Sequence, residues 1–441
     1  MIVKKARFMF EEAIGRTYYS KRTYVKIVNS KVDSVVRKET IGGRLFASQR
    51  KRVYFTNMDS LSTAGIEKSV RQANFAMEGI EPKPDYYGIA RGRFRYKSCG
   101  FDKKLASISV KKATDIANSA IAGAVENGAT NVAGMLVIRY EDNALSSTTG
   151  IAGSYESTLV KLSLRVFHSD FSFQDIRAAR NLSGLKPARM GKDAAEMACS
   201  IIKTGRIRNG SYDIVYTPSP GGGLMSNVND AACMGSAETG SFLTKKLGEE
   251  VADRGITIYD DGKNSDAVSS TPFDEEGYPT QRTTVIKRGV MHSYLHNWST
   301  AQKYHTKSTG NAGLVFPDTN TMFFENRKRL KDVGELIRQV DKGVLVTNTW
   351  YTRFSNYLKG DFSTVPRDLA IYIEKGEPKF AIRQGSVGSM VGIRISDNMP
   401  RMLKNVEYST RDSSQATSWD NEGSFYFMPS VLVKGVKLTT A

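Results

Sequence analysis

Two of the four histidines have a spacing that could serve a metal ion. His292 and His296 are separated by three residues, and on a helix this spacing places both imidazoles on one face, as zinc peptidases require. The intervening residues are Ser, Tyr and Leu, so the glutamate that would activate a metal-bound water is missing. Residues 285–298 have instead the pattern of a hairpin turning at Arg288–Gly289, and on a strand the two imidazoles would lie about 13 Å apart. We favour ordinary strand histidines, and a metal at His292, His296 or His305 stays open as the alternative.

Acidic residues form a second candidate group. The run Asp274-Glu275-Glu276-Gly277 closely follows Asp260-Asp261, and carboxylate oxygens at this density can hold a hard divalent cation. The run lacks the spacing of an EF-hand loop. A solvated turn between strands is therefore the favoured interpretation.

A glycine-rich segment at 218–223 stands between a predicted strand and a predicted helix. Backbone amides in such a position can cradle a phosphate at the helix amino terminus. The segment has neither the GxGxxG spacing nor a following Lys-Ser/Thr, so the nucleotide-binding fingerprints are absent. We expect a simple tight turn.

The composition is that of a globular protein. The chain has 441 residues, of which 40% are hydrophobic and 24% charged, so it holds enough apolar material for real cores. No run reaches the roughly 18 apolar residues of a membrane-spanning helix, and Glu11 and Glu12 interrupt any amino-terminal signal peptide. The three cysteines are too few and too far apart for a disulfide framework. We expect a cytoplasmic protein without membrane contact.

Positive charge is concentrated near the amino terminus. The net charge is +18, and the first 100 residues hold 21 Lys+Arg against 9 Asp+Glu. Between Tyr87 and Lys97, aromatic and basic residues alternate, a pattern used to stack single-stranded nucleic acid. The same alternation is typical of a strand with one apolar face. We favour a basic, solvated surface, and nucleic acid is an unlikely partner on this interpretation.

The first half of the sequence predicts an α+β domain over residues 1–207. Helical character over about the first 15 residues is followed by a meander of three short strands between Tyr24 and Tyr54, with turns at 29–31 and 41–43. The remaining predicted elements are helices at 60–77, 110–127 and 192–204, and strands at 133–140 and 157–167.

The second half, residues 208–441, predicts a mostly antiparallel β domain with few helices. It opens with a strand at 212–217 and a helix that includes Leu224 to Met234. From Ile256 onward strand patterns dominate, with turns at glycines and one helix near 330–340. The predicted fold class of the whole chain is α+β.

The segment 271–290, with the sequence TPFDEEGYPTQRTTVIKRGV, strongly resembles a hallmark of the TldD/TldE (PmbA) metallopeptidase family. Members carry the pattern pf-D-(D/E)-E-G-x-P followed by a strand that ends at a glycine turn. The resemblance continues at 247–249, 258–262, 294–295, 300–301, 308–311, 360–363 and 372–377. It is firmest over residues 212–441 and is limited to the order of elements in the first half.

The family contains two kinds of chain, which differ in the sequence of one helix. The TldD kind has HExxxH on the helix after the strand that begins the second domain, and a later cysteine ligand. At the corresponding positions this chain has Ser226 and Ala231 in place of the histidines and Asn227 in place of the glutamate, and no cysteine follows Cys233. Ser, Asn and Ala cannot jointly hold zinc. The chain is therefore similar to the TldE/PmbA kind, with no cofactor of its own and zinc in a TldD-like partner.

The resemblance implies a subunit of a zinc metalloprotease complex that degrades short or unfolded peptides and is inactive alone. The expected partners are a peptide substrate and an HExxxH-bearing subunit in a heterodimer, with a homodimer left open. No residue is predicted to be catalytic, and the candidate peptide or interface contacts are Asp274, Glu275, Glu276, Gly277, Arg282, Ser308, Thr309, Gly310 and Asn311. The alternatives are a DNA-gyrase-modulating or nucleic-acid-associated factor and a stand-alone hydrolase with a non-standard metal site.

Overall fold

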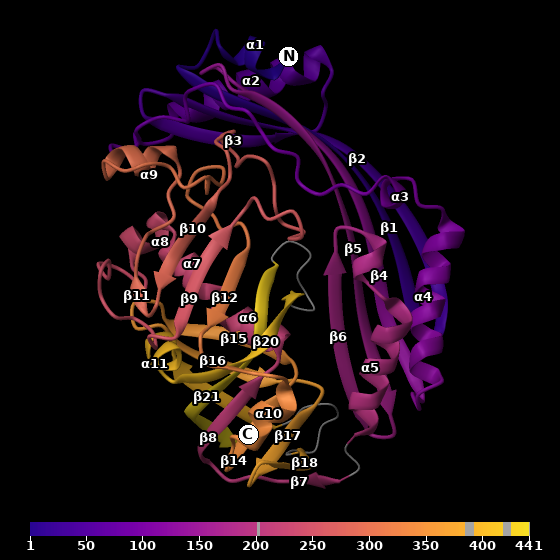
Figure 1. Cartoon of the computed structure of the whole chain (residues 1–441). Coiled ribbons are helices and arrows are strands. Elements are labelled where there is room, and N and C mark those ends of the chain that lie inside the picture. Colours follow the sequence, from indigo (N-terminus) through magenta and orange to yellow (C-terminus); the bar gives the residue numbers. More distant parts are fainter. Residues whose placement is uncertain (201–202, 384–391, 418–424, 441) are drawn as a thin grey trace.

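Two β-sheets organise the chain, one built from each half of the sequence (Figure 1). The computed structural model describes residues 1–200, 203–383, 392–417 and 425–440. The first sheet has six strands in the order β3-β2-β1-β4-β5-β6. Their bounds are β1 Glu12–Val28, β2 Lys31–Gln49, β3 Arg52–Met58, β4 Asn131–Ser147, β5 Ala152–His168 and β6 Phe171–Ala179.

The strands of the first sheet are much longer than the sequence predicted. β1 and β2 pair along nearly their whole lengths, and the predicted turn at 29–31 joins them, with Asn29 and Ser30 at positive φ. The predicted turn at 41–43 is wrong, because these residues lie inside β2. Position 42 requires glycine because the Tyr18 ring lies over it, and a Cβ at this position would lie 2.4 Å from that ring. The predicted helical start is also shorter, since β1 already begins at Glu12.

Helices cover the outer, convex face of the first sheet (Figure 1). Apolar side chains from alternate positions of β1, β4 and β5, such as Ile27, Leu136 and Leu162, form one core with helices α4 and α5. Helix α4 begins at Val110 as expected, with Ser109 as its cap, whereas α5 begins five residues before the predicted start, with Pro187 in its first turn. The helices of this half are α1 Ile2–Ala6, α2 Thr63–Glu78, α3 Lys103–Ala106, α4 Val110–Val125 and α5 Pro187–Cys199.

The second sheet has 15 strands and is mixed. Antiparallel pairs predominate among the described residues, but β8–β14, β12–β21, β13–β20 and β7–β18 are parallel. The strands are β7 Thr204–Gly205, β8 Gly210–Tyr216, β9 Ile256–Asp261, β10 Arg282–Lys287, β11 Val290–Met291, β12 Met322–Asn326, β13 Arg329–Leu330, β14 Lys342–Val346, β15 Thr349–Asn356, β16 Asp361–Pro366, β17 Ala370–Glu374, β18 Glu377–Ile382, β19 Ile393–Asn398, β20 Val406–Ala416 and β21 Tyr426–Thr440.

Short helices join the strands of the second sheet. They are α6 Pro218–Met225, α7 Asn227–Ala232, α8 Met234–Thr239, α9 Trp298–Lys303, α10 Val333–Arg338 and α11 Met399–Lys404. The α+β class predicted from the sequence is confirmed. In the described ranges, no helix combines the length and apolar character needed to cross a membrane.

Gly191 on α5 generates a stability prediction. A Cβ at this position would lie 2.0 Å from the backbone oxygen of Ala120 on α4, so Gly191→Ala must push the two helices apart. Helix propensity favours alanine by about 1 kcal/mol, whereas overpacking costs about 1–3 kcal/mol, so we expect the free energy of unfolding to fall by up to about 2 kcal/mol. Urea titration measures the change.

The control is Gly79→Ala at the end of α2, where the nearest atom to the new Cβ is 3.9 Å away and φ is negative. We expect this variant to stay within about 0.5 kcal/mol of the wild type. A Gly191→Ala protein as stable as the control would contradict the packing argument.

Candidate functional site

Strand β8 leads directly into the three consecutive helices α6, α7 and α8. The glycine-rich segment 218–223 is the first part of α6, so the predicted tight turn is wrong. Glycine is needed because the Tyr426 ring packs on this helix, and a Cβ on Gly222 would lie 2.0 Å from it. The glycines therefore allow α6 to pack closely on β21, and this packing determines the position of α7.

A cleft of about 360 Å³ opens beside α7. Its lining is partly apolar, with Phe242 and Phe354 opposite Asn227 and Asp230 of the helix. Desolvation and then the negative charges of Asp318 and Asp260 raise the pKa of Asp230 to about 6. The cleft thus presents one titratable carboxyl group beside aromatic walls.

The residues at the positions of the family's metal motif line this helix and do not suit zinc. The Ser226 hydroxyl donates to the carbonyl of Gly223 at 3.4 Å, and the Asn227 amide donates to the carbonyls of Gly223 and Leu224 at 3.1 and 3.0 Å. Ala231 offers only a methyl group, so the set contains neither imidazole nor thiolate. Within the described part of the chain, no group of three or more His, Cys, Asp or Glu is placed to hold a metal ion.

Asp260, at the end of β9, connects α7 with the loop that follows residue 308. It is completely buried, and its two oxygens accept hydrogen bonds from Asn229 of α7 at 3.3 Å, from Asn311 at 2.8 Å and from both nitrogens of Asn320 at 2.9 Å. Burial raises the pKa of this carboxyl to about 6, and the four donors counteract the rise. Among the residues that the structure describes, the side-chain oxygens of Asn229 and Asn311 have no hydrogen-bond partner.

The structure brings together two turns that the sequence singled out separately. Asp274 accepts hydrogen bonds from the backbone N–H groups of Glu276, Tyr278 and Ala312 at 2.9–3.0 Å. The backbone N–H of Glu275 in turn donates to the carbonyl of Ala312 at 3.1 Å. The candidate contact residues at 274–277 and 308–311 are therefore one packed unit.

The second of these turns is closed by hydroxyl groups. Thr309 and Ser308 both donate to the carbonyl of His296, at 3.0 and 3.4 Å, and Thr309 also accepts the backbone N–H of His296 at 2.7 Å. Gly310 has φ 69° and lies against Pro279, where a Cβ would meet the backbone oxygen at 2.5 Å. These residues are buried and serve the packing of the loop.

The turn at 274–277 also joins the two sheets. Arg16 on β1 forms an ion pair with Glu275, and the same guanidinium donates to Asn143 at 3.0 Å and to the Tyr155 hydroxyl at 3.1 Å. The Tyr96 hydroxyl donates to the carbonyl of Gly277 at 2.7 Å. The acidic run is therefore an internal junction and not the solvated turn that the sequence favoured.

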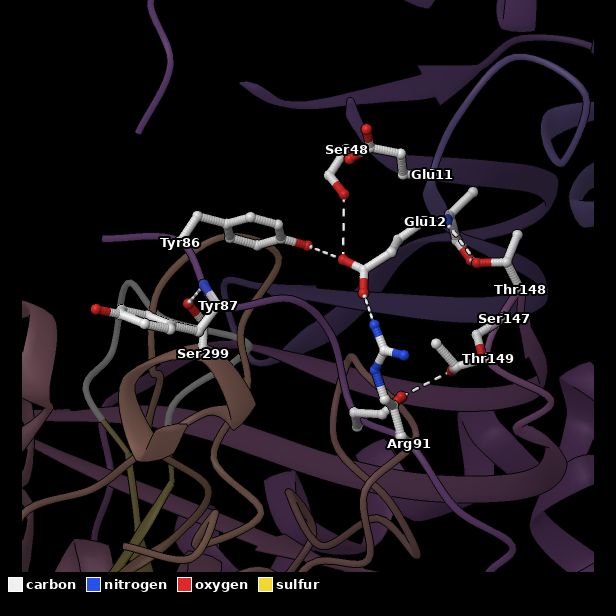
Figure 2. Close-up of polar contacts among 12 residues, drawn as sticks. Glu11, Glu12, Ser48, Tyr86, Tyr87, Arg91, Ser147, Thr148, Thr149 and Ser299 are labelled. Carbon is white, nitrogen blue, oxygen red and sulfur yellow. Dashed lines mark hydrogen bonds and ion pairs between the residues drawn. The ribbon is translucent and has the colours of Figure 1, made fainter. Parts of the chain in front are cut away.

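A second buried carboxylate, Glu12 at the start of β1, supports this junction (Figure 2). It accepts hydrogen bonds from the hydroxyls of Tyr86 at 2.7 Å and Ser48 at 3.2 Å, and it pairs with Arg91 at 2.7 Å. The same segment reaches the second half, since the backbone N–H of Tyr87 donates to Ser299 on α9 at 2.9 Å. Part of the alternating aromatic and basic segment is thus used for internal contacts.

Glu276 is the most deeply placed carboxyl of the junction. It is buried, accepts backbone hydrogen bonds from Trp298 and Ala90, and faces the negative charges of Asp274 and Glu12. Burial raises the pKa values of both Asp274 and Glu276. Because Asp274 has three backbone donors, it is the more acidic of the two, and Glu276 holds a proton to higher pH.

Arg282 and His292 lie apart from this unit, whereas the backbone of His296 is hydrogen-bonded to Ser308 and Thr309 within it. Arg282 stacks on the ring of Tyr259 with its guanidinium carbon 3.4 Å from the ring centre. The prediction of strand histidines is wrong, because β11 ends at Met291 and both His292 and His296 follow it. His292 is exposed, whereas His296 is buried against Thr300, and burial lowers its pKa to about 4.

Sequence reasoning missed the partners that assemble the site. Asp260 was considered only as a cation ligand, and Asn229, Asn320 and Arg16 were not singled out. Arg16 belongs to an alternating polar pattern on β1 that could have signalled a second contact face. The asparagines carried no local signal, because their role depends on a carboxylate distant in sequence.

Comparisons with known proteins agree with this architecture. Residues 209–440 match the PmbA/TldA metallopeptidase C-terminal domain, and residues 103–201 match the central domain of the same proteins. The chain is 25% identical over 318 residues to a metalloprotease PmbA homolog of Haemophilus influenzae, covering 68% of this chain and 65% of the relative. It is 24% identical over 274 residues to a metalloprotease TldD homolog of Buchnera aphidicola, covering 55% of each chain. The matches therefore span about half to two thirds of these relatives.

Solved structures share the whole fold. TldE from Thermococcus kodakarensis superposes with a TM-score of 0.82 at 18% identity, covering 99% of both chains. A protein from Thermotoga maritima, described as a candidate modulator of a DNA gyrase, superposes with a TM-score of 0.81 at 21% identity, covering 97% of this chain and 96% of its own.

The buried carboxyl groups predict how stability depends on pH. Burial places the folded-state pKa values of Asp260, Asp274 and Glu276 above those of the unfolded chain, so the folded protein binds more protons. The free energy of unfolding is therefore expected to fall as pH rises from 6 to 8, by up to about 1.4 kcal/mol per pH unit for each of Asp274 and Glu276, because Asp260, with a pKa of about 6, has already released most of its proton by pH 7. His296 acts in the opposite sense only below about pH 6.5. Urea unfolding followed by tryptophan fluorescence measures the slope.

Glu276→Gln is expected to make this slope shallower, because the amide keeps an acceptor oxygen for the Trp298 N–H and cannot ionise. Glu249→Gln, at an exposed residue paired with Lys246, is the matched control and should keep the wild-type slope. Stability that rises with pH over this window would contradict the assignment.

Proposed function

Because this chain belongs to the PmbA/TldD metallopeptidase family, we propose that it is the TldE-like, metal-free subunit of a zinc metalloprotease complex that degrades short or unfolded peptides. The observation that carries the proposal is the donor set of α7. The side chains of Ser226 and Asn227 donate hydrogen bonds to carbonyls of the preceding turn, and the methyl group of Ala231 has no atom that could bind a metal. The zinc of the complex would then be held by a partner that carries HExxxH.

The cleft beside α7 supports a role without a metal of its own. It is open to the surface and has aromatic walls formed by Phe242, Phe354 and Tyr357. A subunit of this kind contributes by excluding water from the partner's site and by contacting the peptide. The hairpin between β15 and β16 lies beside this cleft and exposes Tyr357 and Leu358, which are 67% and 63% accessible. Exposed apolar side chains at such a rim favour a second polypeptide as the neighbour.

Reconstitution tests the proposal. The chain is to be co-expressed with an HExxxH-bearing family member, and the pair purified through a tag on this chain alone. We expect a stable complex that contains zinc and cleaves unstructured peptides, whereas this chain alone contains no stoichiometric zinc and cleaves none. Size-exclusion chromatography, metal analysis and a peptide-release assay measure the three properties.

The matched control is the same complex with glutamine in place of the HExxxH glutamate of the partner. It should assemble normally and lose activity, because the general base is removed. Tightly bound stoichiometric zinc in the isolated chain, or unaided peptide cleavage by it, would overturn the proposal.

A further inference from the structure

The inner, concave face of the first sheet is strongly basic. Helices cover the convex face, and the second half of the chain lies on the inner side of the curve (Figure 1). Alternate residues of β1 point inward with matching residues of β2 and β4 and enclose a groove of about 330 Å³. We define the basic face by its five cations, Arg16, Arg22, Lys38, Arg44 and Arg139.

Strand register places like charges directly opposite one another on this face. Arg16 of β1 pairs with Arg44 of β2, and Arg22 stands between Lys38 of β2 and Arg139 of β4. Such cross-strand pairs are destabilising in isolation. A sheet that carries two of these rows has a surplus of positive charge on one face that an anion would relieve.

The nearby carboxylates neutralise only part of this positive charge. Glu141 forms ion pairs with Arg22 at 3.5 Å and with Arg139 at 3.6 Å, and Arg16 pairs with Glu275. Lys38 and Arg44 form no ion pair with any residue in the described ranges of the chain, although both line the groove. Two cations therefore remain available to a ligand.

The groove continues into the space between the two halves of the chain. Arg16 and Glu141 line both the groove and an adjoining cavity of about 260 Å³, whose other wall includes Thr271, Asp274 and Asn311. A ligand extended along the basic face would thus lead toward the junction that supports the candidate site. Tyr18, between Arg16 and Arg22 on β1, and Tyr24, which follows Arg22, offer ring surface and hydroxyl groups along this path.

We propose that the basic face binds an extended acidic segment of a polypeptide substrate. This inference rests on the proposed function, since it names the substrate class of the same subunit. Carboxylate side chains would bind Lys38 and Arg44, while backbone groups could use the Tyr hydroxyls and Glu141 as partners. A nucleic acid is disfavoured, because it carries a phosphate at every nucleotide and could not avoid Glu141 in the groove or Glu275 and Asp274 at its inner end, whereas a peptide can place neutral residues there.

Fluorescence anisotropy with the isolated full-length chain tests the inference without requiring the partner or peptidase activity. The probe is a rhodamine-labelled peptide of about ten alternating Glu and Ala residues, compared with peptides that carry Gln or Lys in place of Glu. We expect the Glu peptide to bind most tightly and to weaken when salt is raised from about 0.05 M to about 0.3 M. The double variant Lys38→Gln/Arg44→Gln should weaken it about tenfold.

Lys111→Gln, on the exposed surface of α4, is the matched control and should leave binding unchanged. Equal binding of the Glu and Gln peptides, no measurable binding, or equal effects of Lys111→Gln and the double variant would overturn the inference. A labelled oligothymidine that binds more tightly than the Glu peptide, and loses affinity in the double variant, would overturn it in favour of single-stranded nucleic acid. Because no catalysis is measured, failure here leaves the reconstitution result to decide the proposed function by itself.

Discussion

Burial of the carboxyl groups of Asp274 and Glu276 in one turn is the constraint on which the arrangement of the two sheets depends. A buried carboxylate without donors costs several kcal/mol, so this turn can exist only where backbone N–H groups converge on it. Those donors come from the loop at Ala312, from the start of α9 at Trp298 and from Ala90 in the first half. Three distant segments are thereby held at one point.

The same principle extends from the junction to the cleft beside α7. Asp260 is buried among amide donors, and two of its asparagines belong to α7 and to the loop of the junction. A displacement of either segment would leave a buried carboxylate short of donors, which makes the network resist small shifts. Helix α7 therefore keeps its place through the hydrogen bond from Asn229 to Asp260 and the burial of Val228 and Ala232, without a ligand at Ser226 or Ala231.

Local patterns in the sequence predicted the elements better than their extents. Apolar patterning located β4, β5 and the start of α4 near Val110, because those signals are contained in a few neighbouring residues, whereas the first half of β1 was expected to be helical. The length of β2 was not predicted, because glycines 42 and 43 suggested a turn. Gly42 instead makes room for the Tyr18 ring of the neighbouring strand β1. The segments 274–277 and 308–311 were both singled out, but their contact through Ala312 depends on the tertiary fold.

The two faces of the first sheet differ in polarity because different parts of the chain pack against them. Its convex face meets α4 and α5 and holds the larger apolar core, whereas the concave face has a smaller buried cluster that includes Ile14 and Phe46. The concave face can therefore tolerate Arg16 opposite Arg44, a pairing that a sheet relying on that face for its core could not hold. Glu275 of the second half neutralises one end of this face, while Lys38, toward the other end, forms no ion pair with any residue in the described part of the chain. The net positive charge of this face therefore increases along the strands away from the junction. An anionic chain would place its negative charges at the end distant from the junction.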